Sequence, residues 1–135
     1  MTPTPQRLTF ALPGNEAFAA QLSTALGSGL GRLETRHFPD GESYVRLHGD
    51  PAGRAVDLVC TLARPDAQFL PLVFAADAAR DLGAIEVNLV CPYLAYMRQD
   101  KRFHEGESDT SLSFARLISS TFDKLGKVAA AEGIT

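Results

Sequence analysis

The stretch AVDLVCTLARPDAQFLPLVFAADAARDLGAIEVNLVC, residues 55–91, decides the fold. It starts with the apolar run 55–61 and ends with the apolar run 86–91, and both runs have the length and composition of strands buried on two faces. Between them, apolar residues recur at helical spacing over 66–82, with Asp66 as the expected N-cap. A strand, a helix and a strand joined by short links predict two parallel strands with a right-handed crossover.

The flanking residues predict the remaining elements of the same architecture. The expected elements are a strand over 7–12, a helix from Asn15 to Gly27, strands over 33–38 and 43–47, and a helix over 110–122. The Asn15 side chain is placed to accept a free backbone N–H of the first helical turn. Pro39-Asp40-Gly41 between two short strands favours a tight hairpin turn. The sequence therefore predicts an α/β fold with a mostly parallel sheet flanked by helices.

Length and charge restrict the classes of protein to which the chain can belong. Its 135 residues, 45% hydrophobic and 21% charged, suit one ordinary globular domain. The 13 Lys and Arg against 16 Asp and Glu give a net charge of -3, which excludes affinity resting mainly on nucleic-acid phosphates. The sequence contains neither a membrane-spanning apolar segment nor a secretion signal. We therefore expect a cytoplasmic protein that has neither a nucleic-acid nor a membrane partner.

Cysteines, histidines and glycines in this sequence predict structural roles. Cys60 and Cys91 lie inside apolar runs, which favours reduced thiols packed in the core. The histidines, His37, His48 and His104, lack metal-ligand spacing, so we expect no metal-binding residues. Glycines 27, 29 and 31 follow a helix, whereas the glycines of a dinucleotide fingerprint follow a strand, so a helix cap and loop are expected there.

The segment YMRQDKRFHEGE, residues 96–107, is a candidate ligand site. It follows the strand 86–91, and open α/β sheets bind ligands outside the carboxyl ends of their strands. Its three cations could bind phosphates, while its two aromatic rings and Gln99 could hold a base. The same composition also fits a solvated loop, because Asp100 and two glutamates balance the cations.

The segment FPDGE, residues 38–42, is a second candidate. Asp40 and Glu42 could accept hydrogen bonds from an adenine amino group or a ribose hydroxyl. A plain hairpin turn explains the same residues, and the spacing alone does not choose between the two interpretations.

Both segments resemble motifs of the ribose-phosphate diphosphokinases, also called phosphoribosyl-diphosphate synthetases. FPDGESYVRL at 38–47 is similar to the family's F-x-D-G-E-x-x-V-x-I, and 96–107 is similar to its Y-x-R-Q-D-[KR]-x-F-x-x-G-E. The helix between them and the strand after it also follow the family order, so the resemblance covers residues 7–122. It implies a type I phosphoribosyltransferase-like fold, of which the chain resembles the N-terminal half.

The resemblance also implies an activity and a site. Family members transfer the diphosphoryl group of ATP to ribose 5-phosphate with Mg²⁺, giving AMP and the phosphoribosyl diphosphate used in nucleotide biosynthesis. The implied ATP-binding positions are Phe38, Asp40, Gly41, Glu42, Arg98, Gln99 and Asp100. In the family, the hairpin loop reaches the ATP site of a neighbouring subunit, so a homo-oligomer is implied.

The end of the chain departs from the family pattern. Residues 123–135 contain no metal-binding histidine and no buried-strand pattern, so we expect a domain over 1–122 and an atypical tail over 123–135. The family's basic catalytic loop and its ribose 5-phosphate loop are also absent, and no catalytic residue is assigned. We expect the chain alone to be inactive. The alternative is a catalytically inactive family member that regulates, or assembles with, an active synthetase.

Overall fold

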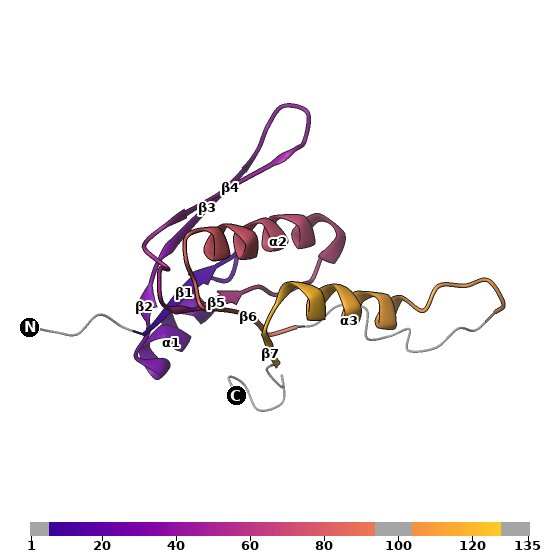
Figure 1. The fold of residues 1–135 in the computed structure, drawn as a ribbon. Coiled ribbons are helices and arrows are strands. Elements are labelled where there is room, and N and C mark those ends of the chain that lie inside the picture. Colours follow the sequence, from indigo (N-terminus) through magenta and orange to yellow (C-terminus); the bar gives the residue numbers. More distant parts are fainter. Residues whose placement is uncertain (1–5, 94–103, 128–135) are drawn as a thin grey trace, which may run out of the picture.

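The computed structural model describes residues 6–93 and 104–127 (Figure 1). The elements, in chain order, are β1 (Arg7–Ala11), α1 (Glu16–Leu26), β2 (Gly29–Leu30), β3 (Arg32–His37), β4 (Ser43–His48), β5 (Ala55–Val59), α2 (Pro65–Asp81), β6 (Glu86–Cys91), α3 (Thr110–Thr121) and β7 (Lys124–Lys127). None of the helices in these two ranges is long and apolar enough to cross a membrane.

Five strands form one sheet in the order β2-β1-β5-β6-β7, while β3 and β4 pair separately as an antiparallel hairpin. All neighbouring strands of the larger sheet run parallel. The register places Leu8 beside Val56 and Val56 beside Val87, so apolar residues of successive strands align in rows. The α/β fold with a mostly parallel sheet, predicted from residues 55–91, is confirmed.

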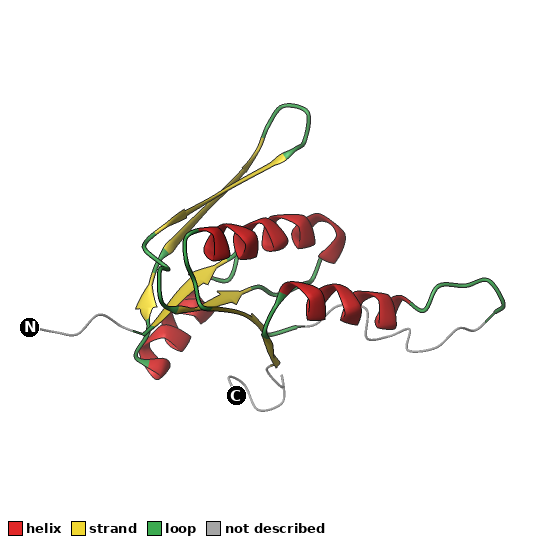
Figure 2. Cartoon of the chain, in the orientation of Figure 1, coloured by secondary structure: helices red, strands yellow, loops and turns green. Residues whose placement is uncertain are grey.

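One face of the sheet is apolar and carries the main core. Phe10, Leu58 and Leu89 on this face are fully buried, as is Leu72 of α2, which packs in the same cluster. Phe114 of α3 joins this layer, with its ring centroid 5.3 Å from that of Phe69 in α2. Figure 2 shows α1 on the opposite side of the sheet from α2. The sheet is therefore covered by helices on both faces, which is typical of a parallel sheet.

The other face carries a row of polar side chains across four strands. The register partners in this row are Thr9, Asp57, Asn88 and Lys124. The Arg7 guanidinium donates to both Asp57 carboxylate oxygens, at 2.9 and 2.7 Å, and Asn88 Nδ2 donates to Asp57 Oδ1 at 3.1 Å. Asn88 Nδ2 also donates to Glu86 Oε2 at 2.9 Å, and Glu86 Oε1 lies 3.3 Å from Lys124 Nζ. Asp57, only 2% exposed, is thus paired with a charge and hydrogen-bonded.

Asn15 occupies the N-cap position of α1, but its side chain makes no capping hydrogen bond. Its Nδ2 donates to the Leu12 carbonyl at 3.2 Å, and its Oδ1 accepts the Thr61 backbone N–H at 2.8 Å. The predicted position of Asn15 is confirmed, but the predicted capping hydrogen bond is wrong, because the amide instead joins the segments that follow β1 and β5. The predicted end of the helix is confirmed, with Gly27 as a left-handed C-cap.

The long helix α2 starts one residue earlier than expected. Arg64 is its N-cap and Pro65 its first residue, so Asp66 lies in the first turn and the prediction that it is the cap is wrong. Proline at this position loses no helical hydrogen bond, because the first N–H groups of a helix have no partner within it. Asp66 in the first turn still interacts favourably with the positive end of the helix dipole.

Two strands, both at the edges of the sheet, were not predicted from the sequence. β2 lies in the glycine stretch expected to be a loop, and β7 lies in the segment 123–135, where no strand was expected. β7 pairs in parallel with β6 through four residue pairs, so the expectation for that segment is wrong. An edge strand needs backbone pairing on one side only, and a short one needs little apolar content. The division into a domain over 1–122 and a tail over 123–135 stays a prediction.

Cys60 and Cys91 are buried, reduced thiols, as predicted. Burial raises the pKa of the Cys60 thiol to about 12, and the neighbouring Cys91 adds to the increase. A neutral thiol is a poor nucleophile and a poor metal ligand, so Cys60 contributes packing to the core.

The stability of the chain in alkaline solution is expected to depend on Cys60. The folded chain holds the pKa of this thiol at about 12, against an ordinary value of 9.0. Between these values the unfolded chain has lost the proton and the folded chain retains it, so the free energy of unfolding falls as pH rises through that window. Cys60→Ala removes this contribution. Urea denaturation below and within the window should therefore show that the free energy of unfolding falls less steeply with pH in the variant than in the wild type. Equal slopes for the two proteins would show that Cys60 does not titrate differently on unfolding.

Candidate functional site

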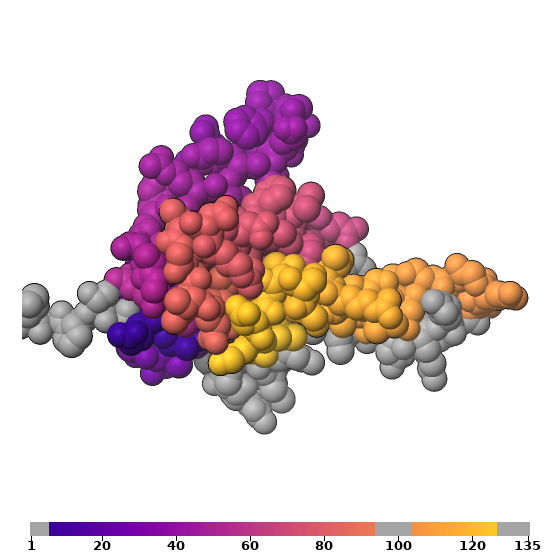
Figure 3. All heavy atoms as spheres, in the orientation of Figure 1, coloured from indigo at the N-terminus to yellow at the C-terminus, as the bar shows by residue number. Residues whose placement is uncertain are grey.

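The hairpin of β3 and β4 extends away from the sheet (Figure 1). Its base is anchored by Leu33, Val45 and Leu47, which pack against the core. Its tip, residues 38–42, is exposed throughout, and Figure 3 shows this end of the hairpin standing out from the body of the molecule. The tip is therefore free to contact another molecule.

Three hydrogen bonds fix the conformation of the tip. The Phe38 N–H donates to the Glu42 carbonyl and the Gly41 N–H donates to the Phe38 carbonyl, both at 2.8 Å. Asp40 Oδ1 accepts the Glu42 N–H at 3.0 Å. Gly41 has a φ of 92°, a conformation that residues with a Cβ rarely adopt. The predicted turn is confirmed, and the turn itself uses one of the two Asp40 carboxylate oxygens.

Three side chains on one face of the hairpin form a cluster beside the tip. The Phe38 and Tyr44 rings are perpendicular, with centroids 6.0 Å apart. The Arg36 guanidinium carbon lies 4.3 Å from the Tyr44 ring centroid. Arg36 and Tyr44 are register partners, which explains the contact. Tyr44 was not predicted as a site residue from the sequence. Its position two residues after Glu42, opposite Arg36 in the expected hairpin, could have indicated that its ring lies beside the tip.

Glu34 links the two strands closer to the hairpin base. Its Oε1 lies 2.9 Å from His48 Nε2, and Arg36 Nε lies 4.0 Å from its other oxygen. The hydrogen bond from His48 lowers the pKa of Glu34, and charges on His48, Arg36 and Arg32 add to that effect. The contact supports the expected structural role of His48.

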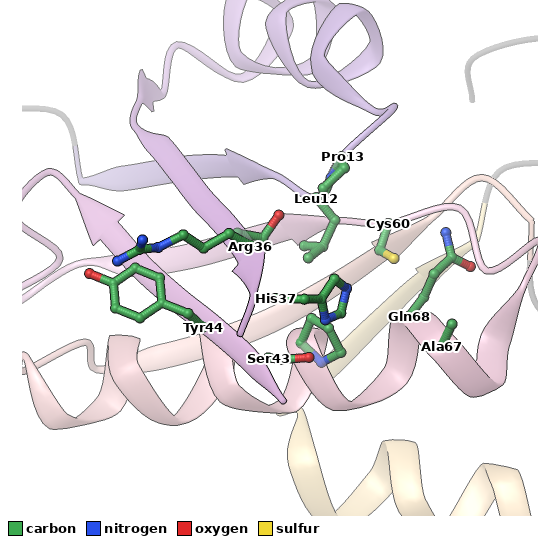
Figure 4. Close-up of a pocket in the computed structure, with 11 residues that line it drawn as sticks. Leu12, Pro13, Arg36, His37, Ser43, Tyr44, Cys60, Ala67 and Gln68 are labelled. Atoms are coloured by element: carbon green, nitrogen blue, oxygen red, sulfur yellow. The ribbon is translucent and has the colours of Figure 1, made fainter. Parts of the chain in front are cut away.

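A pocket of about 220 Å³ lies where the hairpin meets α2 (Figure 4). Leu12, Pro13 and Cys60 line it from the carboxyl ends of β1 and β5, and Gln68 lines it from α2. In Figure 4 the His37 ring lies between Leu12 and α2, while Arg36 extends beside Tyr44. The pocket thus lies at the edge of the sheet where open α/β folds bind ligands.

Arg98, Gln99 and Asp100 lie outside the described residues, so the structure does not place them relative to the hairpin tip. The described end of the same segment contains His104, whose Nε2 lies 3.9 Å from Glu107 Oε1. Of the predicted ATP-binding positions, the structure brings together Phe38, Asp40, Gly41 and Glu42.

Within residues 6–93 and 104–127, no three His, Cys, Asp or Glu side chains gather as a possible metal site. We therefore assign no metal ligand among these residues.

Residues 8–126 match the family described as the N-terminal domain of ribose phosphate pyrophosphokinase. The ribose-phosphate pyrophosphokinase of Methanobrevibacter smithii is 37% identical over 106 residues, which are 78% of this chain and 36% of that protein. The enzyme of the same name from Saccharolobus solfataricus is 39% identical over 99 residues, or 73% of this chain and 34% of that protein. The chain spans about a third of the length of these relatives.

Solved structures show the same fold. Phosphoribosylpyrophosphate synthetase from Mycobacterium smegmatis is similar with a TM-score of 0.81 and 21% identity, over 92% of this chain and 42% of that one. Purine phosphoribosyltransferase from Pyrococcus horikoshii is similar with a TM-score of 0.51 and 20% identity, over 64% of this chain and 59% of that one. These similarities support the predicted phosphoribosyltransferase-like fold. From the family match and the sequence identity to the curated relatives, we conclude that the chain belongs to the ribose-phosphate pyrophosphokinase family, of which it represents the N-terminal domain.

Proposed function

We propose that this chain is the nucleotide-binding N-terminal domain of a ribose-phosphate pyrophosphokinase. In this proposal the hairpin tip binds the adenine of ATP, and Arg98, Gln99 and Asp100 contact the nucleotide. The observation that carries the proposal is the tip itself, where an exposed ring and two carboxylates are held in one hydrogen-bonded turn.

The chemistry of the tip suits adenine. The Phe38 ring is 45% exposed and offers an apolar surface on which a base can stack. The turn leaves the second oxygen of Asp40 and the exposed carboxylate of Glu42 as acceptors for the adenine amino group. Guanine carries a carbonyl oxygen at that position, and two acceptors facing each other repel. The tip should therefore prefer adenine to guanine.

In the complete enzyme, the oxygen on C1 of ribose 5-phosphate attacks the β-phosphorus of ATP. The bond from the β-phosphorus to the oxygen that bridges it to the α-phosphorus breaks, AMP leaves with that oxygen, and the proton of the C1 hydroxyl is released to solvent. Phosphoryl transfer depends on positioning and on neutralising the phosphate charge, so we assign the Arg98 guanidinium to the phosphates. Mg²⁺, when bound, would supply further charge neutralisation.

The projection of the hairpin supports a site shared between two copies of the chain. Its tip is exposed and stands away from the body that carries it, so it can reach a nucleotide held by a neighbour. We therefore propose a homo-oligomer in which residues 38–42 of one copy meet residues 98–100 of another.

Glu42→Ala is expected to weaken binding of Mg·ATP roughly three- to tenfold, because an acceptor for the adenine amino group is lost. Binding of Mg·GTP should change much less, so the preference for ATP should shrink. Isothermal titration of the chain with both nucleotides measures this difference.

Asp81→Ala is the matched control, because Asp81 is an exposed carboxylate at the far end of α2. It removes the same charge and should leave both affinities unchanged. If the two variants weaken Mg·ATP binding equally, Glu42 acts only through the net charge of the chain and makes no specific contact with adenine. Arg98→Ala should weaken both nucleotides alike, since both carry the same phosphates. A full-length protein that binds Mg·ATP but makes no phosphoribosyl diphosphate would favour the regulatory or assembly role instead.

A further inference from the structure

We propose that Tyr44 is a positioning residue for the hairpin tip, and that it holds the Phe38 ring ready to stack on adenine. The inference rests on the proposed function of the tip. The family motif leaves the position of Tyr44 open, so the role is inferred from the geometry of this chain.

The contact between the two rings leaves stacking surface available on Phe38. Their planes are at 90° and their centroids 6.0 Å apart, which is an edge-to-face arrangement. If the Phe38 edge points at Tyr44, both faces of Phe38 stay free of Tyr44. If the Tyr44 edge points at Phe38, one face stays free. In either case Tyr44 can restrain Phe38 without taking the place of a base.

Tyr44 is itself held more firmly than Phe38. It lies within the paired part of the hairpin, opposite Arg36, whose guanidinium packs over its ring at 4.3 Å. Phe38 lies one residue beyond the last strand pair, His37 with Ser43, and its ring is 45% exposed. The tip backbone is fixed by hydrogen bonds, but these do not set the rotamer of the Phe38 side chain. The ring contact with Tyr44 can do so.

Restraining Phe38 before the ligand arrives increases affinity. A mobile side chain loses rotamer freedom when a base stacks on it, and that loss weakens binding. A side chain already confined to the bound rotamer loses less. Removing the Tyr44 ring should therefore weaken ATP binding roughly three- to tenfold. Inorganic tripolyphosphate has no base, so its affinity should not depend on Tyr44.

The test compares Mg·ATP with Mg·tripolyphosphate by isothermal titration of the full chain. Tyr44→Leu should weaken ATP alone, and Tyr44→Phe should restore wild-type affinity because it keeps the ring. Phe74→Leu is the control, since it removes a half-exposed aromatic ring from α2. A general loss of structure would lower the affinities for both ligands together. Three-bond couplings of Phe38, measured by NMR without ligand, should indicate one dominant rotamer in the wild type and averaging in Tyr44→Leu.

The outcomes separate this inference from the proposed function. If Phe38→Leu weakens ATP binding and Tyr44→Leu does not, the positioning role is overturned while the function of the tip stands. Unchanged Phe38 couplings in Tyr44→Leu would also overturn it. If Phe38→Leu leaves ATP binding intact, the adenine-binding role of the tip is wrong, and the positioning role falls with it.

Discussion

Asp57→Ala is expected to lower the free energy of unfolding by about 3 kcal/mol, the lower end of the range for breaking a buried ion pair. Asp57 is only 2% exposed and accepts hydrogen bonds from Arg7 and from Asn88. Its removal leaves the buried Asn88 amide with one partner fewer. The Arg7 side chain is 36% exposed, so water can solvate part of its charge, which limits the loss.

Chemical denaturation of the wild type and Asp57→Ala at neutral pH measures this effect. Asp77→Ala is a suitable control, because it removes an exposed carboxylate from α2 and should change stability by less than about 0.5 kcal/mol. If Asp57→Ala lowers the free energy of unfolding by less than about 1 kcal/mol, the attraction within the ion pair is hardly larger than the cost of desolvating its two charges.

Gly31→Val is expected to destabilise the chain by about 2–3 kcal/mol through overpacking. A Cβ on Gly31 would overlap the Phe10 ring, which is itself fully buried. The Gly31 N–H donates to the Thr9 carbonyl at 2.8 Å, so the backbone cannot move away without losing that bond. Since Gly31 immediately precedes β3, any shift that relieves the clash displaces the base of the hairpin.

Gly126→Val provides the comparison for this prediction. Gly126 lies in the edge strand β7, and the nearest atom to an added Cβ would be 3.9 Å away. Thermal or urea unfolding should therefore show a small change for Gly126→Val and a large one for Gly31→Val. Similar losses in both variants would indicate a general effect of valine in place of glycine, with no specific role for the contact with Phe10.

The central part of the fold could be predicted because its sequence signals are strong and local. The apolar runs that became β5 and β6, with the helical periodicity between them, determine a parallel unit without reference to the rest of the chain. The edge strands β2 and β7 could not be predicted in this way. Their stability comes from backbone bonds to β1 and β6, which are contacts distant in sequence.

The hairpin turn was predictable for a similar reason. Pro39, Asp40 and Gly41 each favour the turn through their own backbone and side-chain chemistry. The partners of Asn15 and Tyr44 depend on tertiary structure. Asn15 has the chemistry of a cap, yet a backbone N–H 46 positions along the chain takes its oxygen. The ATP-binding roles of Arg98, Gln99 and Asp100 stay predictions.

The polar row on the sheet also favours the observed alignment of the strands over a shifted one. Valine and leucine runs on two neighbouring parallel strands could pair almost equally well after a shift, because every position is apolar. Sliding β6 by one residue would separate Asn88 from Asp57 and place an apolar side chain beside a buried carboxylate. The same slip would expose Asn88 to the apolar layer beneath α2. The hydrogen bond between Asn88 and Asp57 thus opposes a one-residue shift between these two strands.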